Sequence, residues 1–340
     1  MSDKKYSSGL SALIYVVLII LPVVLFLLSL GLGAYHIKPM DVVQSLWAIV
    51  SGSEVDVDDL TLNLIKTVRL PRLCGAVVVG AGLACSGAVF QGLFKNPLAS
   101  PYTLGVSNGA GFGAALAIIL SLGAVGIQAG AIVFGLLAVS ITFILGSYAK
   151  GSTATLILAG MLVGSLFASL VSLIKFVADP FEKLPQIVFW LMGSLASLNM
   201  KAILGVLPIY IFAMVVLLLF RWRLNILSMG DTEARSFGLN VKRDRAVIIF
   251  AASVITALSV SVAGVIGWVG VVIPHFARML VGPDYRKLLP ASLSLGISYL
   301  IVIDDLCRLV SATEIPIGVI TGIIGAPLFI YFIYKKKVSW

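Results

Sequence analysis

The sequence predicts an all-α, polytopic membrane protein with about ten transmembrane helices. Hydrophobic residues make up 60% of its 340 residues and charged residues only 11%, and the mean hydropathy is +1.10. Because a helix needs about 20 apolar residues to cross the hydrocarbon core, this chain has room for about ten crossings and for little else. We therefore expect a single transmembrane domain over residues 1–340.

Ten apolar segments follow one another along the chain at the length of a membrane-spanning helix. The first of them is much longer than the core of a signal peptide, so we expect it to be a retained span. The stretch 186–197 resembles a helix but is not expected to cross fully. The expected spans are 10–33, 73–92, 98–120, 124–147, 155–176, 202–220, 246–264, 267–281, 288–304 and 315–334.

The distribution of positive charge predicts the orientation. With ten crossings, both termini lie on one side, and 16 of the 24 Lys and Arg residues fall on that side. Cytoplasmic loops carry the excess of Lys and Arg, so both termini are expected in the cytoplasm. The loop from Tyr35 to Arg69, which carries five acidic residues, is then external. A net charge of +9 is explained by this orientation signal and does not indicate nucleic-acid binding.

A break in the membrane helices is expected around Pro97 and Pro101, because proline removes a helix hydrogen bond. Freed backbone groups at membrane depth must be satisfied by protein or water. The same region, from Arg69 to Gly113, carries two Arg and one Lys in otherwise apolar sequence. This combination indicates a transport pathway or a docking surface.

The sequence gives little support to an ion-coupled carrier, a metal site or an intramembrane enzyme. No expected span has a carboxylate near its centre, whereas ion-coupled carriers place ionisable groups there, so a secondary transporter is the weaker hypothesis. Cys74, Cys85 and Cys307 show no metal-ligand spacing, and His275 stands alone, so no metal site is expected. No HExxH or GxSxG motif supports an intramembrane enzyme.

The segment from Arg221 to Arg245 is the only long segment expected in the cytoplasm. Asp231 and Thr232 can cap a short helix that Gly238 ends, and Asn240 can begin a second short helix. Two short helices joined at a glycine suit insertion into a groove of a partner, although a plain interfacial loop would have similar residues. The chain contains no GxxxxGK[ST] phosphate loop, so any energy from ATP must come through a partner.

Ordered motifs over nearly the whole chain resemble the permease subunits of the FecCD-type family of type II ABC importers, which carry iron-siderophore complexes, haem and cobalamin. The motifs are RLPR at 69–72, GAxLAxSGAxxQxxFxNPLAxPxxLGVSxGA at 80–110, LAG at 158–160, LxMGDTEARSFGL at 227–239, GxIGWVGVVIPHFARMLVGPDYRKLLP at 264–290 and EIPIGVITGIIGAPLFIYFI at 314–333.

The resemblance implies a type II ABC importer permease fold and a set of partners. These are a second copy of the chain, two cytoplasmic ATPases that hold ATP and Mg²⁺, and an external substrate-binding protein. The chain itself would bind no cofactor and catalyse no reaction, and it would lie in the cytoplasmic membrane of a prokaryote. An iron-siderophore complex is the expected cargo, with haem, cobalamin and an oxyanion such as molybdate as alternatives.

The resemblance also implies roles for individual residues. Arg69, Arg72 and Arg308 match arginines that dock the binding protein, although local pairing of Arg308 with Asp304, Asp305 or Glu314 is the simpler alternative. Ser152 and Thr153 match an inner gate, with helix capping as the alternative. The residues that match the coupling helices seated in the ATPase are Gly230, Glu233, Ala234, Arg235 and Gly238.

Overall fold

A computed structural model describes residues 8–33, 35–148, 153–310 and 314–334. Every regular element within these ranges is a helix, which confirms the predicted all-α class. The elements are α1 (Ser8–Gly31), α2 (Pro39–Ser51), α3 (Asp59–Leu64), the π-helix η1 (Ile65–Arg69), α4 (Leu70–Phe94), α5 (Val106–Ile119), α6 (Gly123–Tyr148), α7 (Thr153–Val177), α8 (Lys183–Met192), α9 (Met200–Met229), α10 (Asp231–Ser236), α11 (Val241–Ala263), α12 (Val269–Val281), α13 (Tyr285–Leu309) and α14 (Ile317–Tyr334).

Ten of these helices correspond to the ten expected spans. Seven helical segments are long and apolar enough to cross a membrane, and α5, α12 and α14 are shorter apolar helices. Most boundaries agree within a few residues, as for α4 against the expected 73–92. The expected span 98–120 is shorter in the structure, because residues 95–105 form turns around Pro97 and Pro101. The predicted break is therefore present.

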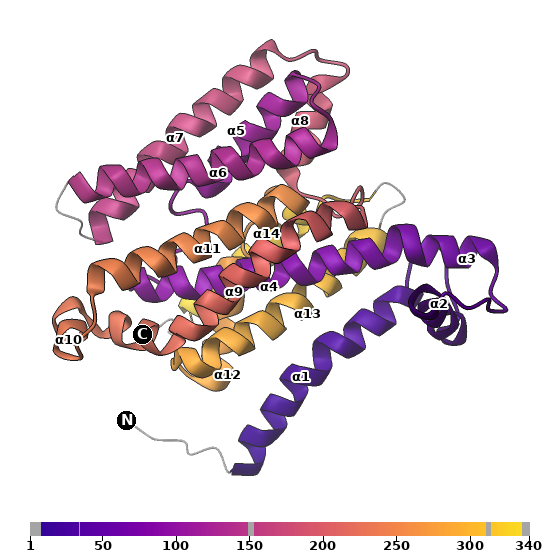
Figure 1. Cartoon of the computed structure of the whole chain (residues 1–340), viewed down its shortest axis with the longest axis horizontal. Coiled ribbons are helices and arrows are strands. Elements are labelled where there is room, and N and C mark those ends of the chain that lie inside the picture. Colours follow the sequence, from indigo (N-terminus) through magenta and orange to yellow (C-terminus); the bar gives the residue numbers. More distant parts are fainter. Residues whose placement is uncertain (1–7, 34, 149–152, 311–313, 335–340) are drawn as a thin grey trace.

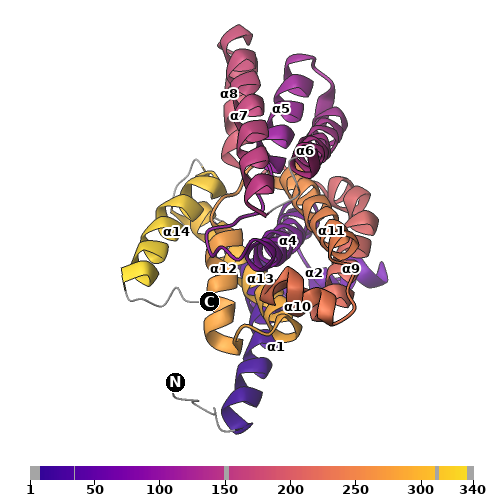
Figure 2. The same cartoon turned by 90° about the vertical axis from the view of Figure 1, so that its left-hand side faces the viewer.

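The helix α4 is the centre of the molecule. All but three of its residues are buried, and α9, α11, α12 and α13 pack around it (Figure 2). Glycines permit this packing because they let helix backbones approach closely. A Cβ atom on Gly80 would collide with the backbone of Gly296 in α13, and a Cβ atom on Gly87 would collide with the backbone of Gly270 in α12.

The helices α5, α6, α7 and α8 form a second layer, seen at the top of Figures 1 and 2. Within this layer, α5 crosses α6 where Gly113 and Gly130 meet. The layer has small apolar cores of its own, such as the one formed by Ala138, Val163 and Phe167. It joins the central bundle through contacts of α5 and α6 with α11.

The two ends of the bundle differ, and they are named here by the short helices they carry (Figure 1). At the α10 end, Lys95 at the end of α4 donates a hydrogen bond to the carbonyl of Met229 in α9, at 2.7 Å. At the α2 end, Arg72 near the start of α4 contacts Asp304 near the end of α13.

The connecting segments hold short helices, and one expectation about them was wrong. The segment from Tyr35 to Arg69 is largely helical, because Pro39 begins α2 and the Asp58 side chain caps α3. The expected second short helix at 241–245 does not exist as a separate element. Asn240 does cap a helix, but the apolar residues that follow extend that helix without a break to Ala263.

The crossing of α4 and α12 gives a stability prediction. Gly87→Ala should lower the free energy of unfolding by about 1–3 kcal/mol, because the added methyl group meets rigid backbone. The measurement is thermal unfolding of the purified protein in detergent. Gly205→Ala in α9 is the matched control, because nothing lies within 4 Å of its Cβ position. Equal effects of the two substitutions would contradict close backbone packing at Gly87.

Candidate functional site

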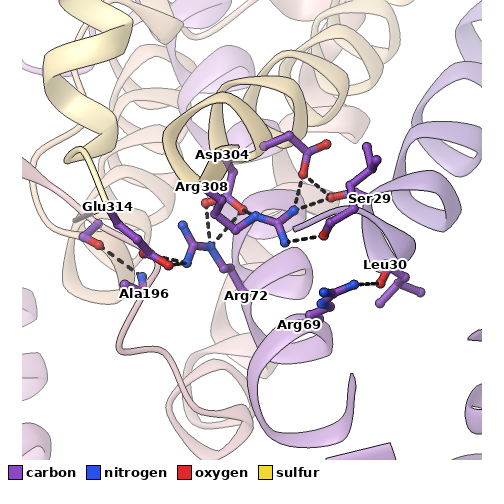
Figure 3. A network of polar contacts seen from close by, with 11 residues as sticks. Ser29, Leu30, Arg69, Arg72, Ala196, Asp304, Arg308 and Glu314 are labelled. Atoms are coloured by element: carbon purple, nitrogen blue, oxygen red, sulfur yellow. Dashed lines mark hydrogen bonds and ion pairs between the residues drawn. The ribbon is translucent and has the colours of Figure 1, made fainter. Parts of the chain in front are cut away.

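The three arginines predicted for docking lie together at the α2 end of the bundle (Figure 3). Arg69 ends η1, Arg72 lies in the first turn of α4, and Arg308 lies in the last turn of α13. Both Arg69 and Arg72 are only 4% exposed. Buried guanidinium groups are costly unless they are paired and hydrogen-bonded, so their partners decide what they can do.

Arg72 is held between two carboxylates from distant parts of the chain. Its Nε lies 2.8 and 2.9 Å from the two oxygens of Asp304, and its Nη1 lies 2.8 and 2.7 Å from those of Glu314. Asp304 is fully buried, whereas the Glu314 side chain is 41% exposed. Arg72 therefore ties α4 to α13 and to the residues just before α14.

Arg308 extends the same network toward α1. Its Nε lies 3.3 Å from Asp304, its Nη2 pairs with Asp305, and the same nitrogen donates to the Ser29 hydroxyl at 2.7 Å. The Ser29 hydroxyl in turn donates to Asp305 at 2.5 Å. The simpler alternative from the sequence, local pairing of Arg308, is the arrangement that the structure contains.

Arg69 has a different set of partners. Its guanidinium donates to the carbonyl of Leu30 at 2.5 Å and to the carbonyl of Tyr35, which lie at and beyond the end of α1. Leu30 lies in the last turn of α1, and a helix end leaves the carbonyls of that turn without intrahelical donors. The π-helix η1 ends two residues before Pro71, which has no N–H to continue the regular ladder. Arg69 thus closes the end of α1.

All three arginines are therefore engaged inside the protein. The network described for them holds three cations and three anions, so its charges balance. Docking by these arginines stays a prediction. The sequence singled out the arginines and Asp304, but the pairing of Arg72 with Asp304 joins residues 232 positions apart. No local pattern in the sequence reports such a pairing.

The residues predicted for coupling lie at the opposite, α10 end. The helix α9 extends to Met229, nine residues beyond the expected span, and α10 follows directly after Gly230. The Glu233 side chain lies over Gly230, where any Cβ atom would collide with its carboxylate. Only glycine at position 230 leaves room for this contact.

A Schellman motif at Gly238 caps the C-terminal end of α10. The Leu239 N–H bonds to the Ala234 carbonyl at 3.0 Å, and the Gly238 N–H bonds to the Arg235 carbonyl at 2.9 Å. Gly238 has φ +76°, a left-handed conformation that glycine adopts without strain. Ala234 is fully buried beneath the turn. Gly238 therefore permits the turn, and Ala234 packs beneath it.

Charged and apolar side chains of the same segment face outward. Glu233 and Arg235 are exposed, and Met229 and Phe237 are each 60% exposed. An ion pair of 2.5 Å between Asp231 and Arg245 fastens the start of α10 to α11. The projection is thus joined to α11 by an ion pair and presents a mixed surface that suits a protein partner.

The remaining residues singled out in the sequence are those of the inner gate and His275. Of the predicted gate, Thr153 is the first residue of α7, and Ser152 lies outside the described residues. His275 is buried against Phe329 and Phe332 of α14. Across the described ranges, no group of three or more His, Cys, Asp or Glu side chains gathers as a metal site would.

The Arg72 network gives a prediction that separates structure from docking. Arg72→Met should destabilise the protein by about 3–5 kcal/mol, because it leaves the buried Asp304 without its main partner. The double variant Arg72→Met with Asp304→Leu should recover much of this loss. Thermal unfolding in detergent measures both. An unchanged unfolding temperature for Arg72→Met would contradict a structural role.

Comparisons with known proteins agree with this architecture. The family model described as FecCD transport family matches residues 19–335. The molybdate import system permease protein MolB of Haemophilus influenzae is 40% identical over 321 residues, which cover 94% of this chain and 95% of MolB. The cobalamin import system permease protein BtuC of Halobacterium salinarum is 39% identical over 277 residues, or 81% of this chain and 74% of BtuC.

A solved structure gives the same result for the fold. It is described as an inward-facing conformation of a proposed metal-chelate type ABC transporter, and it matches with a TM-score of 0.84 at 39% identity. The match covers 94% of this chain and 97% of that chain. The chain is therefore a multi-pass membrane permease of the ABC importer type, and it belongs to the FecCD transport family.

Proposed function

We propose that this chain forms the translocation pathway of an ATP-driven importer, as a homodimer with two cytoplasmic ATPases and an external substrate-binding protein. The match to the molybdate import system permease protein MolB, 40% identical over 94% of this chain and 95% of MolB, is the observation that carries the proposal. The excess of Lys and Arg at the α10 end supports a cytoplasmic position of that end and of both termini. The membrane would be the cytoplasmic membrane of a prokaryote.

In this proposal the chain is not catalytic, and ATP and Mg²⁺ are bound by the partner ATPases. The α10 projection is the contact through which ATP binding and hydrolysis would move the helices. Glu233 and Arg235 reach outward to the ATPase, whereas Gly230, Ala234 and Gly238 shape the turn that carries them. Thr153, the first residue of α7, and Ser152, which precedes it in the sequence, would form the inner gate on the same side.

The α2 end would dock the substrate-binding protein. Arg69, Arg72 and Arg308 lie there, but their guanidinium groups already have partners inside the chain. Docking through them therefore requires carboxylates of the binding protein to share these groups or to replace an internal partner. The half-exposed Glu314 is the internal partner most accessible to such an exchange.

The second copy of the chain would cover apolar surface on α7 and α14. Exposed side chains on these helices include Leu162 at 71%, Phe176 at 87% and Ile323 at 64%. A passage between two such faces would be lined by apolar groups. This lining favours a cargo whose metal charge is enclosed by an organic ligand, so an iron-siderophore complex is the first candidate and haem or cobalamin would pass by the same argument.

Molybdate is the second candidate, because the H. influenzae relative that covers 94% of this chain bears that name. The cobalamin relative, at 39% identity, is nearly as similar. Two relatives of nearly equal sequence identity are named for different cargoes, so identity does not distinguish molybdate from cobalamin as the cargo of this chain. The cargo has to be identified by measuring transport.

The coupling role predicts that Glu233→Ala with Arg235→Ala abolishes ATP-driven uptake. The protein would be reconstituted in proteoliposomes with its ATPase and binding protein, and uptake of labelled cargo would be followed. Both side chains are exposed, so the unfolding temperature should not change. Glu182→Ala with Lys183→Ala, before and at the start of α8, is the matched control. Full uptake by the first variant would contradict coupling through α10.

The cargo prediction uses the same proteoliposomes with the unaltered protein. We expect uptake of a ferric siderophore that requires ATP and the binding protein, and no uptake of molybdate. Molybdate uptake alone would replace the first candidate by the second. Uptake that ignores ATP and follows an imposed proton or sodium gradient would contradict the importer proposal itself.

A further inference from the structure

A groove runs between α1 and α13 at the α10 end of the bundle. It consists of two hollows, one of about 370 Å³ beside the α12–α13 turn and one of about 410 Å³ between α1 and α13. Tyr15 and Lys287 line both hollows, so the two form one continuous groove. We call it the α1/α13 groove.

Prolines in both helices line this groove. Pro22 in α1 and Pro290 in α13 lie in its wall. Because Pro22 has no N–H, it leaves the Leu18 carbonyl without its usual donor, and the Ser294 hydroxyl of α13 supplies a hydrogen bond instead. The two helices are thus fastened at this point, while toward its N-terminus α1 leans away from the bundle (Figure 1).

The lining of the groove has two chemically different parts. The deeper part is apolar and includes Leu18, Ile19 and Leu293. The mouth, beside the α12–α13 turn, is lined by the cations Arg278, Arg286 and Lys287.

The charges at the mouth are only partly compensated. Arg286 pairs with Asp284 at 2.8 Å, and its hydrogen bonds hold the pKa of that carboxyl well below its usual value, so the pair is neutral. Arg278 donates to the neutral side chain of Gln91 at 3.3 Å. Lys287 is exposed, and among the described residues its ammonium has no hydrogen bond or ion pair. Lys287 therefore leaves a positive charge at the mouth.

The position of the groove matches the boundary between headgroups and acyl chains. Lys287 is the third residue of the membrane-spanning helix α13, so it lies where that span begins. Leu293 lies six residues farther along the helix, or about 9 Å deeper at 1.5 Å per residue. With the membrane boundary at the start of α13, the cations lie at the depth of headgroups and the apolar wall at the depth of acyl chains.

We propose that the α1/α13 groove binds one anionic phospholipid, with an acyl chain along the apolar wall and the phosphate at Lys287. Basic pockets between transmembrane helices are known to select anionic headgroups. A larger groove of about 790 Å³ between α6, α9 and α11 has no charged residue in its lining. This larger groove has room for an acyl chain, but it has no charged side chain that would bind a headgroup.

The test is a lipid titration of the full-length protein in detergent, followed by native mass spectrometry. Dioleoyl phosphatidylglycerol and dioleoyl phosphatidylcholine carry the same chains, so their difference isolates the headgroup. We expect phosphatidylglycerol to bind more tightly, and Lys287→Gln to weaken its binding by about fivefold without changing the binding of phosphatidylcholine. Glycerophosphoglycerol, which lacks acyl chains, should not bind.

Two matched controls separate this site from general effects. Lys242→Gln removes an exposed charge at the same end of the bundle but outside the groove, and it should leave binding unchanged. Ile19→Trp should obstruct the groove and weaken both lipids, whereas Ile20→Trp, which is one residue away and outside the lining, should weaken neither.

Several outcomes would overturn the proposal. These are equal binding of the two lipids, equal loss in Lys287→Gln and Lys242→Gln, or unchanged binding by Ile19→Trp. Displacement of the lipid by the partner ATPase would also overturn it, because the mouth would then be a protein contact. An unchanged unfolding temperature confirms that each variant is folded.

Discussion

Close backbone contact around α4 is the constraint on which the rest of the structure depends. In a bilayer, apolar side chains gain little from meeting each other instead of lipid, so helices associate through packing of small residues. Gly80 and Gly87 bring α13 and α12 against α4 at distances that admit no side chain. The polar network at one end and the α10 turn at the other are both held in place by helices that this packing aligns.

The charged groups follow from the same constraint. A buried cation must have partners, and the network at the α2 end supplies them from α1, α13 and the residues before α14. The arginines therefore hold the ends of four helices in register. The side chains proposed to dock a binding protein are therefore the same ones that fix these helix ends.

The sequence predicted the fold well and the contacts poorly, for physical reasons. Hydropathy marks helices such as α6 and α11 because every residue of a span must suit the bilayer, and proline marked the break at Pro97 and Pro101 because its chemistry is local. The helix α2 was missed because it lies in a loop segment of mixed polarity. The continuous α11 was divided because Asn240 was recognised as a cap but the length of the helix was not. The pairing of Arg72 with Glu314 could not be predicted, since 242 positions separate the two residues.

The form of α4 has a mechanical consequence. Its 25 residues contain no proline after Pro71 and no break in the helix, so at 1.5 Å per residue it is a rod of about 37 Å. One end is bonded to α9 through Lys95, and the other is bonded to the segment before α14 through Arg72. A rod without a hinge tilts rather than bends. A displacement of α9 at one end of the bundle would therefore reach Glu314 at the other end as a tilt of α4.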